Sequence, residues 1–445
     1  MRLSSALRSR SIAAVSLRRV LSAAAVLVCS FVCAAVYAQP NRLSRTLELP
    51  SSHWAAAQPI DIQDGGVIRF QTAAGEQSVA AKDCLRWQNW SPPRNRFAIE
   101  LLDGSWLVGE PLWQPDGKFR LRSDWLEECE LSIEEVRTIG FSCPGSAQRW
   151  GEWIDWTEAA QGTDDVVWDA SGRRSTGIVR IDTSSSSRSQ SNRPQVFLDA
   201  GNNKTELADE AVAAIVFSPI LRPPRSKDVG GYAISLRDGS LLRLNRIDKT
   251  TDGRLTLVTS GGRSLMTLDD SEQFAAALQS IQSHPRSVTW LHELTPARFR
   301  SGAKESLLTW PLGNDRDLFG KRPVVRGSLM DHMLFMHAPA QSAYRHDKSP
   351  AMLHGQCGVC PPENTADDRL GSAVFKVLIG KGNQLTEAFV SPTLTPKSDW
   401  LRFSVDLTDA QLFALVVEEA DLGSLGDHCV WREARIVKAD SSGKQ

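Results

Sequence analysis

The sequence lacks the motifs that mark the common hydrolases, metalloproteases and nucleotide-binding enzymes. It has no Gly-x-Ser-x-Gly, no His-Glu-x-x-His and no glycine-rich loop of the kind that cradles phosphate. Aspartate and glutamate are plentiful, but no pair of carboxylates is distinguished by its setting. A glycosidase needs two carboxylates facing each other about 5 to 10 Å apart, and composition alone does not exclude one. We therefore expect a protein without catalytic activity and without a cofactor.

Cysteine is scarce, with eight residues in a chain of 445. This number is too small for a disulfide scaffold, so any bridge is expected to be a local staple. Cys357, Cys360 and Cys429 are the residues expected in such a bridge. One alternative is a zinc site formed by His354, Cys357 and Cys360 with His428 and Cys429, and another is that the cysteines are free thiols. Because no second Cys-x-x-Cys pair or His-x-His pair is present, we predict no metal site.

Long apolar runs are absent after residue 38. Before it, five arginines precede the uncharged run LSAAAVLVCSFVCAAVYA, which ends at Ala38. This pattern is typical of a signal peptide over residues 1–38, cleaved before Gln39. An uncleaved anchor is the alternative, because the run is only slightly shorter than the roughly 20 residues that a membrane span needs. We expect an exported protein in the periplasm, in the cell envelope or outside the cell, touching a membrane only through an uncleaved signal.

The chain also lacks a surplus of positive charge. Its 51 basic and 52 acidic residues give a net charge of −1. Residues 1–38 hold five arginines and no acid, so the remainder has 46 basic and 52 acidic residues, a net charge of −6. A mildly acidic protein is a poor candidate for binding nucleic acid or an anionic membrane surface. We expect no nucleic-acid partner.

What the chain does contain is alternation of apolar and polar residues, interrupted by Asp-Gly. FAIELLDGSWLVGE, from Phe97, and YAISLRDGSLLRLN, from Tyr232, resemble each other closely. A second Asp-Gly follows each of them, at 116 and at 252. Asp-Gly tolerates the positive φ angles of a tight turn, so these segments are interpreted as paired β-hairpins.

A third pattern recurs in ELSIEEVRTIGF, ELADEAVAAIVF and, more loosely, SLMTLDDSEQF. We interpret it as the closing strand and turn of a small β unit of about 50 residues. About four such units are expected in residues 39–283, as small β-barrel-like repeats. The polar spacer 184–194 lies within the third unit, and 269–282 is the best helix candidate.

Residues 284–440 differ from the repeats. A loop-rich stretch is followed by SAVFKVLIG, LTEAFVSPTL, WLRFSVDLTDAQLFALVVEEAD and CVWREARIV. Alternation with a period of two predicts a β-sandwich with one buried face on each sheet. Residues 441–445 are interpreted as a tail. The fold class is therefore mostly β, with repeats followed by a sandwich.

Several of these pieces, in order, resemble the NPCBM family of carbohydrate-binding modules. VTWLHELTPARF is similar to its lead-in strand, Phe335-Met336-His337-Ala338 to its Gly-x-His-small step, and FALVVEEADLGSLGDHCVWREARI to its closing strands. Phe335 replaces a glycine of the family pattern, and Cys360 replaces an acid. The resemblance, confined to residues 287–437, implies a jelly-roll (galactose-binding-like) sandwich that performs no chemistry, a type of module found beside glycosidases and in exported bacterial proteins. It implies a glycan partner. The alternative is an envelope or assembly protein whose sandwich binds protein.

Candidate ligand-binding residues follow from the same match: His337, Asp427, His428 and Trp431. In the structural interpretation, Trp431 fills the core, and Asp427 and His428 fix the loop before the last strand through hydrogen bonds. In the functional interpretation, Asp427, His428 and His337 meet at a loop edge and bind sugar hydroxyls or an ion.

Tryptophan is abundant, with 14 residues against three tyrosines. They include two groups that are closely spaced in the sequence, one formed by Trp87 and Trp90 and the other by Trp150, Trp153 and Trp156. Either they form flat platforms for sugar rings, or they fill the interior of the repeats.

Overall fold

The computed structural model describes residues 46–438, apart from short gaps. The gaps are 51, 115–116, 160–161, 183–193, 202, 208–211, 219, 221–230, 303–308, 326–327, 361–370, 383 and 421–425. The expected signal peptide, nearly all of the polar spacer and the tail therefore lie outside the described residues. The chain from Thr46 onward forms one compact unit. None of the helices seen in it has the length and apolar character needed to cross a membrane.

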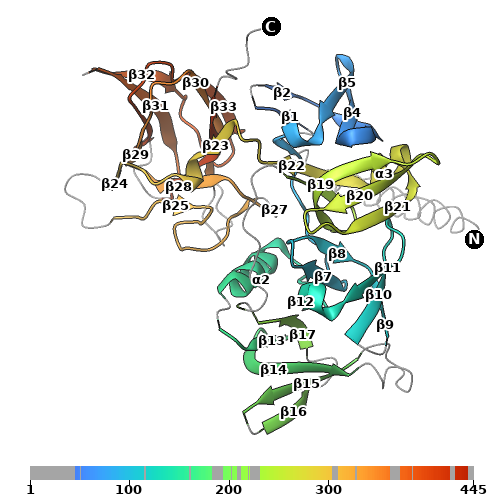
Figure 1. The fold of residues 1–445 in the computed structure, drawn as a ribbon. Helices are drawn as coiled ribbons and strands as arrows, with labels where there is room; N and C mark the ends of the chain where they lie inside the picture. Colours follow the sequence, from blue (N-terminus) through green and yellow to red (C-terminus); the bar gives the residue numbers. More distant parts are fainter. Residues whose placement is uncertain are drawn as a thin grey trace, which may run out of the picture. The chain divides into compact units, whose positions relative to one another are not determined.

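The same strand order occurs four times before residue 284 (Figure 1). Each unit begins with an antiparallel hairpin and continues through further antiparallel strands. Its last strand returns to pair with its first, as β6 pairs with β1, β12 with β7, β17 with β13, and β22 with β18. A short helix precedes the last strand in three of the units. The recurrence agrees with the repeat pattern in the sequence, while the division into separate domains stays a prediction.

The bounds of the units are as follows. The first unit contains β1 (Leu47–Glu48), β2 (His53–Trp54), β3 (Gln58–Gln63), η1 (Asp64–Gly66), β4 (Val67–Thr72), β5 (Gly75–Ala80), η2 (Ala81–Asp83) and β6 (Arg86–Trp87). The second contains β7 (Ala98–Leu101), β8 (Trp106–Val108), β9 (Glu110–Trp113), β10 (Lys118–Arg122), β11 (Cys129–Ser132), η4 (Ile133–Glu135) and β12 (Val136–Gly140), followed by the helix α2 (Ala147–Ala159). The third contains β13 (Asp165–Asp169), β14 (Arg174–Asp182), β15 (Gln195–Ala200), β16 (Asn203–Leu207) and β17 (Val212–Val216). The fourth contains β18 (Tyr232–Leu236), β19 (Leu241–Lys249), β20 (Arg254–Thr259), β21 (Ser264–Asp270), α3 (Ser271–Ala277) and β22 (Leu278–Ser283).

The Asp-Gly-Ser turns of the second and fourth units join these units to each other. Gly104 and Gly239 have φ angles of 77° and 96°, which a side chain would strain. Ser105 Oγ accepts a hydrogen bond from the Arg243 amide at 3.0 Å, and Ser240 Oγ accepts one from the Val108 amide at 3.1 Å. This reciprocal exchange places β8 beside β19.

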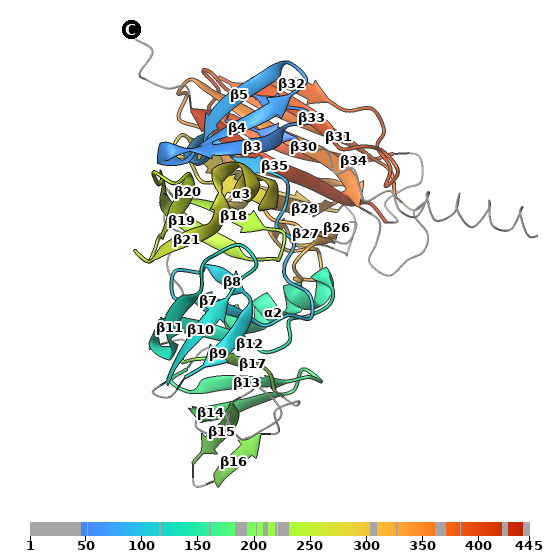
Figure 2. The ribbon, with the colours of Figure 1, turned by 90° about the vertical axis from the view of Figure 1, so that its right-hand side faces the viewer.

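All four units share one long sheet. Its order is β16-β15-β14-β13-β17-β12-β7-β8-β19-β18-β22-β6-β1-β2. The units thus follow one another in the order third, second, fourth, first, which differs from their order in the chain. Helix α3 of the fourth unit packs on β3 of the first (Figure 2), where the Ser271 hydroxyl donates to Asp61 at 2.6 Å.

The helices differ from the sequence prediction. Of the helix predicted over 269–282, only α3 is helical, and β22 begins immediately at Leu278. Pairing with β18 along the whole of β22 prevails over helix propensity there. Helix α2 was not predicted, although Trp150, Trp153 and Thr157 are spaced at helical intervals and are all buried.

The C-terminal region is a two-sheet β-sandwich, so the predicted mostly-β fold class is confirmed. One sheet has the order β25-β28-β35-β30-β33, with β23 also paired to β35, and the other has the order β24-β29-β34-β31-β32. The bounds in the first sheet are β23 (Val288–Trp290), β25 (Gly313–Asn314), β28 (Met333–His337), β30 (Ala351–Cys360), β33 (Leu401–Asp406) and β35 (His428–Lys438). Those in the second are β24 (Arg298–Ser301), β29 (Ala340–Arg345), β31 (Ala373–Lys381), β32 (Gln384–Val390) and β34 (Leu412–Glu419). The turn η5 (Leu291–Glu293) follows β23, and the hairpin β26 (Val324–Val325) and β27 (Ser328–Leu329) precedes β28.

A β-bulge at Glu433 reverses the alternation of β35. His354 pairs with Arg435 and Gln356 with Arg432, so one residue of β30 faces two of β35. Glu433 has a φ of 54° and donates its amide to the His332 carbonyl at 2.7 Å. Strict alternation would have placed Glu433 on the side of Trp431 and Ala434 opposite it. Instead Ala434 joins Trp431 in the core.

Candidate functional site

Trp431 lies between the two sheets, where no ligand reaches it. None of its surface is exposed, and its ring meets Phe375 and Phe403 edge to face at centroid distances of 5.2 Å. This burial contradicts the expectation that Trp431 touches a ligand. It agrees with the structural interpretation, in which Trp431 fills the core. Its inward position on β35 and its large apolar surface are sufficient to explain why Trp431 is present at this position.

The expected disulfide is not formed, because Cys357, Cys360 and Cys429 are all thiols. A spacing of three residues along β30 directs the side chains of Cys357 and Cys360 to opposite faces. Cys357 packs with Cys429 in the core, whereas Cys360 packs against Phe335 and Val430 on the outer face. Burial raises the pKa of Cys429 well above its ordinary value, so this thiol behaves as a small apolar group.

Asp427 has a structural position. It is fully buried, and its Oδ1 accepts a hydrogen bond from the Ser372 amide at 2.7 Å. Its carbonyl accepts from the Ala338 amide at 3.3 Å. Burial raises the pKa of Asp427 to about 6. The residue anchors the loop before β35, and its carboxylate is not presented to solvent.

Replacing Asp427 with asparagine is expected to change how stability depends on pH. A carboxyl whose pKa is raised by folding stabilises the fold below its unfolded pKa, and this contribution is lost as pH rises through the folded value of about 6. Between pH 4 and pH 7 the free energy of unfolding of the parent should therefore fall relative to that of Asp427→Asn, by on the order of 1–3 kcal/mol. Urea unfolding of both proteins across this range measures the difference, and parallel pH profiles would contradict it.

His337 and His428, by contrast, lie side by side on the outer face of the sandwich. They are directly paired across β28 and β35, and their ring centroids are 5.8 Å apart. Both are partly exposed. Their neighbours Met336 and Cys429 point into the core, so alternation turns the two imidazoles outward. These two residues are among the ligand-binding residues predicted from the sequence, and their role in binding stays a prediction.

Two aromatic residues that the sequence reasoning did not identify complete this patch. The Trp310 ring stacks on His337 at 4.9 Å with an interplanar angle of 12°. Phe319 is 61% exposed and meets both Trp310 and His428 edge to face at 6.2 Å. We call Trp310, Phe319, His337 and His428 the aromatic patch.

The loops hold the aromatic patch in place. Ser301 Oγ accepts from the Trp310 amide and donates to the Trp310 carbonyl, both at 2.8 Å. Asp317 accepts from the amides of Phe319 and Lys321 at 2.8 Å, which forms a tight loop with Phe319 at its tip. The outer-face cluster of Leu318, Phe335 and Val430 packs beneath it. An aromatic side chain exposed on a fixed loop is suited to contact a ligand.

The imidazole of His428 favours the neutral state. Burial and the neighbouring His337 lower the pKa of His428, and the opposing effect of Asp317 does not restore it. A neutral imidazole offers one hydrogen-bond donor and one acceptor. His337 Nδ1 already lies 2.9 Å from the Ala338 carbonyl. The arrangement provides apolar ring faces beside hydrogen-bonding groups.

The tryptophans of the repeats are mostly interior. Trp87, Trp150 and Trp153 are at most 4% exposed, and Trp90 is partly buried with its Nε1 donating to the Gly239 carbonyl. Only Trp156 of this group is well exposed, at 39%, and it stacks on Trp168. The core-filling interpretation therefore holds for the three buried tryptophans.

One further group has donors suited to a metal ion. Within the described part of the chain, His292, Asp315 and His332 form the one set whose ligand atoms lie close enough together. All three belong to the sandwich region. None was singled out as a metal ligand from the sequence.

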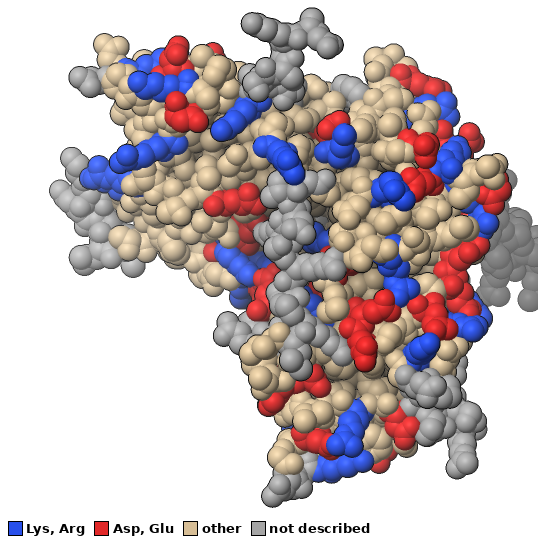
Figure 3. Space-filling view, in the orientation of Figure 1, with Lys and Arg blue, Asp and Glu red and all other residues tan. Residues whose placement is uncertain are grey.

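Charged side chains of both signs are mixed over the surface visible in Figure 3. Many pair locally, as Lys376 does with Glu387 and Glu418. On this face the described residues show no broad area of a single sign.

Comparison with known proteins agrees with the sequence resemblance for the C-terminal third. Residues 287–437 match the family model described as the NPCBM/NEW2 domain. CBM51 from Clostridium perfringens GH95, solved in complex with methyl-galactose, is 19% identical with a TM-score of 0.28, over 34% of this chain and 99% of that one. The tandem CBM51 modules of the family 98 glycoside hydrolase from Streptococcus pneumoniae are 11% identical with a TM-score of 0.29, over 88% and 99%. No curated protein matches the chain.

Proposed function

We propose that the region 284–440 binds carbohydrate at the aromatic patch, and that the protein is exported and performs no chemistry. The match of residues 287–437 to the NPCBM/NEW2 domain supports binding of this class. The proposal of export rests on the arginine-rich, apolar start of the chain.

The observation that supports the patch as the binding site is the stacking of Trp310 on His337 beside the exposed Phe319. The C–H face of a sugar ring packs well on an aromatic ring, because both surfaces are flat and apolar. A sugar also carries hydroxyls around its edge. The imidazoles of His337 and His428 are placed to donate to and accept from these hydroxyls.

A glycan-array screen of the purified protein, followed by calorimetric titration of the strongest glycan, tests this proposal. Trp310→Ala and Phe319→Ala should each weaken binding at least tenfold, which corresponds to about 1.4 kcal/mol. Leu385→Ala is the matched control, because Leu385 is 58% exposed on β32 of the other sheet. Its affinity should equal that of the parent.

Two outcomes would overturn the proposal in different ways. Equal affinities for the parent and both aromatic variants would place the sugar elsewhere on the sandwich. Failure of every glycan to bind would favour the alternative of a protein-binding sandwich. Hydrolysis of a broad panel of glycosides is expected to be absent, and turnover by the parent would contradict the non-catalytic part.

A further inference from the structure

Three loop segments of the sandwich converge at one edge of the first sheet. His292 lies in η5 after β23, Asp315 follows β25, and His332 precedes β28. The strands β23 and β28 both pair with β35, and β25 pairs with β28. Strand pairing therefore brings together three residues that are up to 40 positions apart in the sequence.

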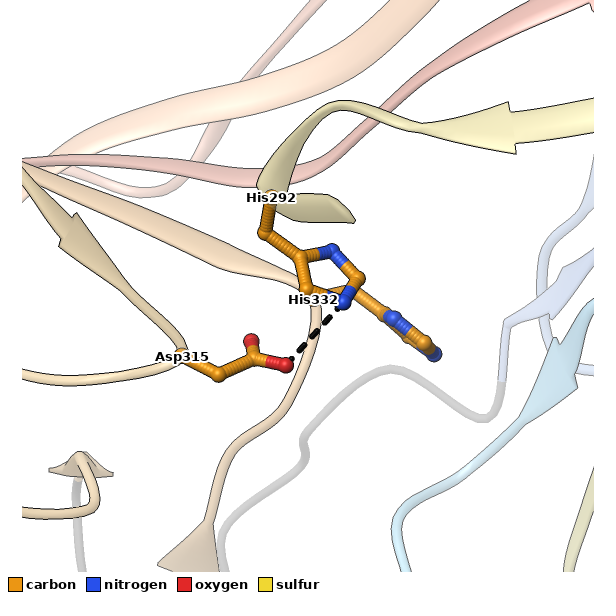
Figure 4. Close-up of side chains that lie close together, drawn as sticks. All are labelled: His292, Asp315 and His332. Carbon is orange, nitrogen blue, oxygen red and sulfur yellow. Dashed lines mark ion pairs between the residues drawn. The ribbon is translucent and has the colours of Figure 1, made fainter. Parts of the chain in front are cut away.

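Figure 4 shows the Asp315 carboxylate directed toward the His292 ring, with the His332 side chain beside that ring on the side away from Asp315. His292 Nε2 lies 3.1 Å from Asp315 Oδ2, and one ligand atom from each of the three residues lies within 4.8 Å of the others. The His292 and His332 side chains are each 6% exposed, and that of Asp315 is 23% exposed. The site is thus shielded, with Asp315 on its more open side.

His332 presents an unused polar atom here. Its Nδ1 is buried without a hydrogen-bond partner, while its Nε2 lies 2.7 Å from the Gln282 amide nitrogen. Its ring stacks on Trp290 at 3.9 Å, and its carbonyl accepts the amide of the bulged Glu433. Buried polar atoms normally have partners, so an orphaned imidazole nitrogen in a fixed ring calls for an explanation.

Asp315 is equally fixed. Its Oδ1 accepts from the Met333 amide at 2.8 Å, and its own amide donates to the Met333 carbonyl at 2.9 Å. Oδ2 is left directed toward His292. Both Asp315 and His332 adopt the left-handed backbone region, with φ angles of 50° and 55°. Such conformations persist where the surroundings hold a side chain in a specific place.

We propose that His292, Asp315 and His332 bind a divalent transition-metal ion of the zinc type. Two imidazoles and one carboxylate are a common protein donor set for zinc, with a water or a fourth side chain completing the tetrahedron. Glu293 Oε1 lies 3.9 Å from His292 Nε2 but is outside the set of mutually close ligand atoms, so water is the expected fourth ligand. Nothing in this inference depends on glycan binding.

The distances between the ligand atoms fit a zinc ion after a small movement of the side chains toward one another. Donors bound at about 2.0–2.2 Å in a tetrahedron are about 3.3 Å apart. The pair His292–Asp315 is already at this separation, at 3.1 Å. The remaining atom pairs, at up to 4.8 Å, close by less than about 2 Å.

Metal binding requires a change of tautomer at His332. In the present arrangement the Gln282 amide donates to Nε2, so Nδ1 carries the ring proton. Burial lowers the pKa of His332 well below its ordinary value, which keeps the ring neutral. The metal replaces the proton on Nδ1, and Nε2 then carries one. A half turn of the Gln282 amide supplies the acceptor for it, at the cost of the 3.0 Å bond from Gln282 to Asp331.

Calorimetric titration of the untagged, chelator-treated full protein with Zn²⁺ tests the proposal, alongside metal analysis after dialysis. We expect one tightly bound zinc per chain and a zinc-dependent rise in melting temperature. His292→Gln and Asp315→Asn should each weaken zinc binding at least tenfold. Asp315→Asn keeps the oxygen that accepts from Met333, so its fold should be retained.

His346→Gln is the matched control. The His346 side chain is 4% exposed and lies in the same sandwich, 3.9 Å from the Asp347 carboxylate, but among the described residues it belongs to no set of three metal donors. This variant should bind zinc as the parent does. Replacing zinc with Co²⁺ should give the visible bands of tetrahedral cobalt in the parent and not in His292→Gln. Equal zinc affinity in all four proteins, or no stoichiometric zinc in the parent, would overturn the proposal.

Discussion

Replacing Trp431 with alanine is expected to lower the free energy of unfolding by about 3–5 kcal/mol, the range for deleting a large buried aromatic side chain. The indole has no exposed surface and meets rings from both sheets, Phe375 on β31 and Phe403 on β33. Its removal leaves a cavity in the centre of the sandwich. The surrounding strands are held in place by their pairing within the two sheets, so they can collapse into the cavity only in part.

Chemical denaturation of the parent and the Trp431→Ala variant measures this loss. Trp310→Ala is the matched control, because it deletes the same group from a partly exposed position in the same region. The control should lose much less stability and should instead affect glycan binding. A loss below about 1 kcal/mol for Trp431→Ala would show that the ring does not support the core.

Replacing Arg86 with methionine is expected to cost a similar amount, about 3–5 kcal/mol, because it removes one of the two arginines, Arg86 and Arg432, that neutralise the buried carboxylate of Glu433. Arg86 on β6 is 5% exposed. Its Nη1 lies 3.1 Å from the Glu433 carboxylate, and its Nη2 contacts Asp331. Glu433 is only 2% exposed, so solvent cannot replace the lost charge. The pair connects the first repeat unit to the bulge of β35.

The control for this variant is Arg120→Met. Arg120 pairs with Glu128 at 3.3 Å, but its side chain is 50% exposed, and such pairs contribute about 0–1 kcal/mol. Adding Glu433→Gln to Arg86→Met should recover part of the loss, because the double variant no longer buries a carboxylate that has lost one of its two arginine partners. Unfolding curves that coincide for the parent and Arg86→Met would contradict the importance of this pair.

The fold was predictable where local chemistry and tertiary pairing agree. The turns at Gly104 and Gly239 need positive φ angles, and the presence of glycine at these positions in the sequence predicts the turns. Prediction failed where distant partners decide the outcome. Residues 278–283 continue the helical periodicity of the preceding segment but pair with β18. Nothing near Glu433 in the sequence indicates the β-bulge, in which one residue of β30 faces two residues of β35.

The candidate site divides in the same way. His337 and His428 lie on regular strands, and their order in the sequence match sufficed to place them together. Trp310 and Phe319 lie on loops, where no periodicity reports the direction of a side chain. His292, Asp315 and His332 have no characteristic spacing, because β-sheet pairing and not a local motif unites them.

The shared sheet of the four repeat units also determines which pieces of the protein can be removed. Deleting the third unit, which lies at one end of the sheet, would uncover the edge of β12 and the part of the tryptophan cluster that packs on Val166 and Trp168, but it would leave the rest of the ladder intact. Deleting the second would sever the ladder and leave β17 and β19 with unpaired backbone groups. Open edges of this kind recruit other chains and lead to aggregation. Insertion or loss of a whole repeat is therefore tolerated best at the two ends of the sheet, in the third and first units. The third unit lies at an end of the sheet although it is in the interior of the repeat region in sequence.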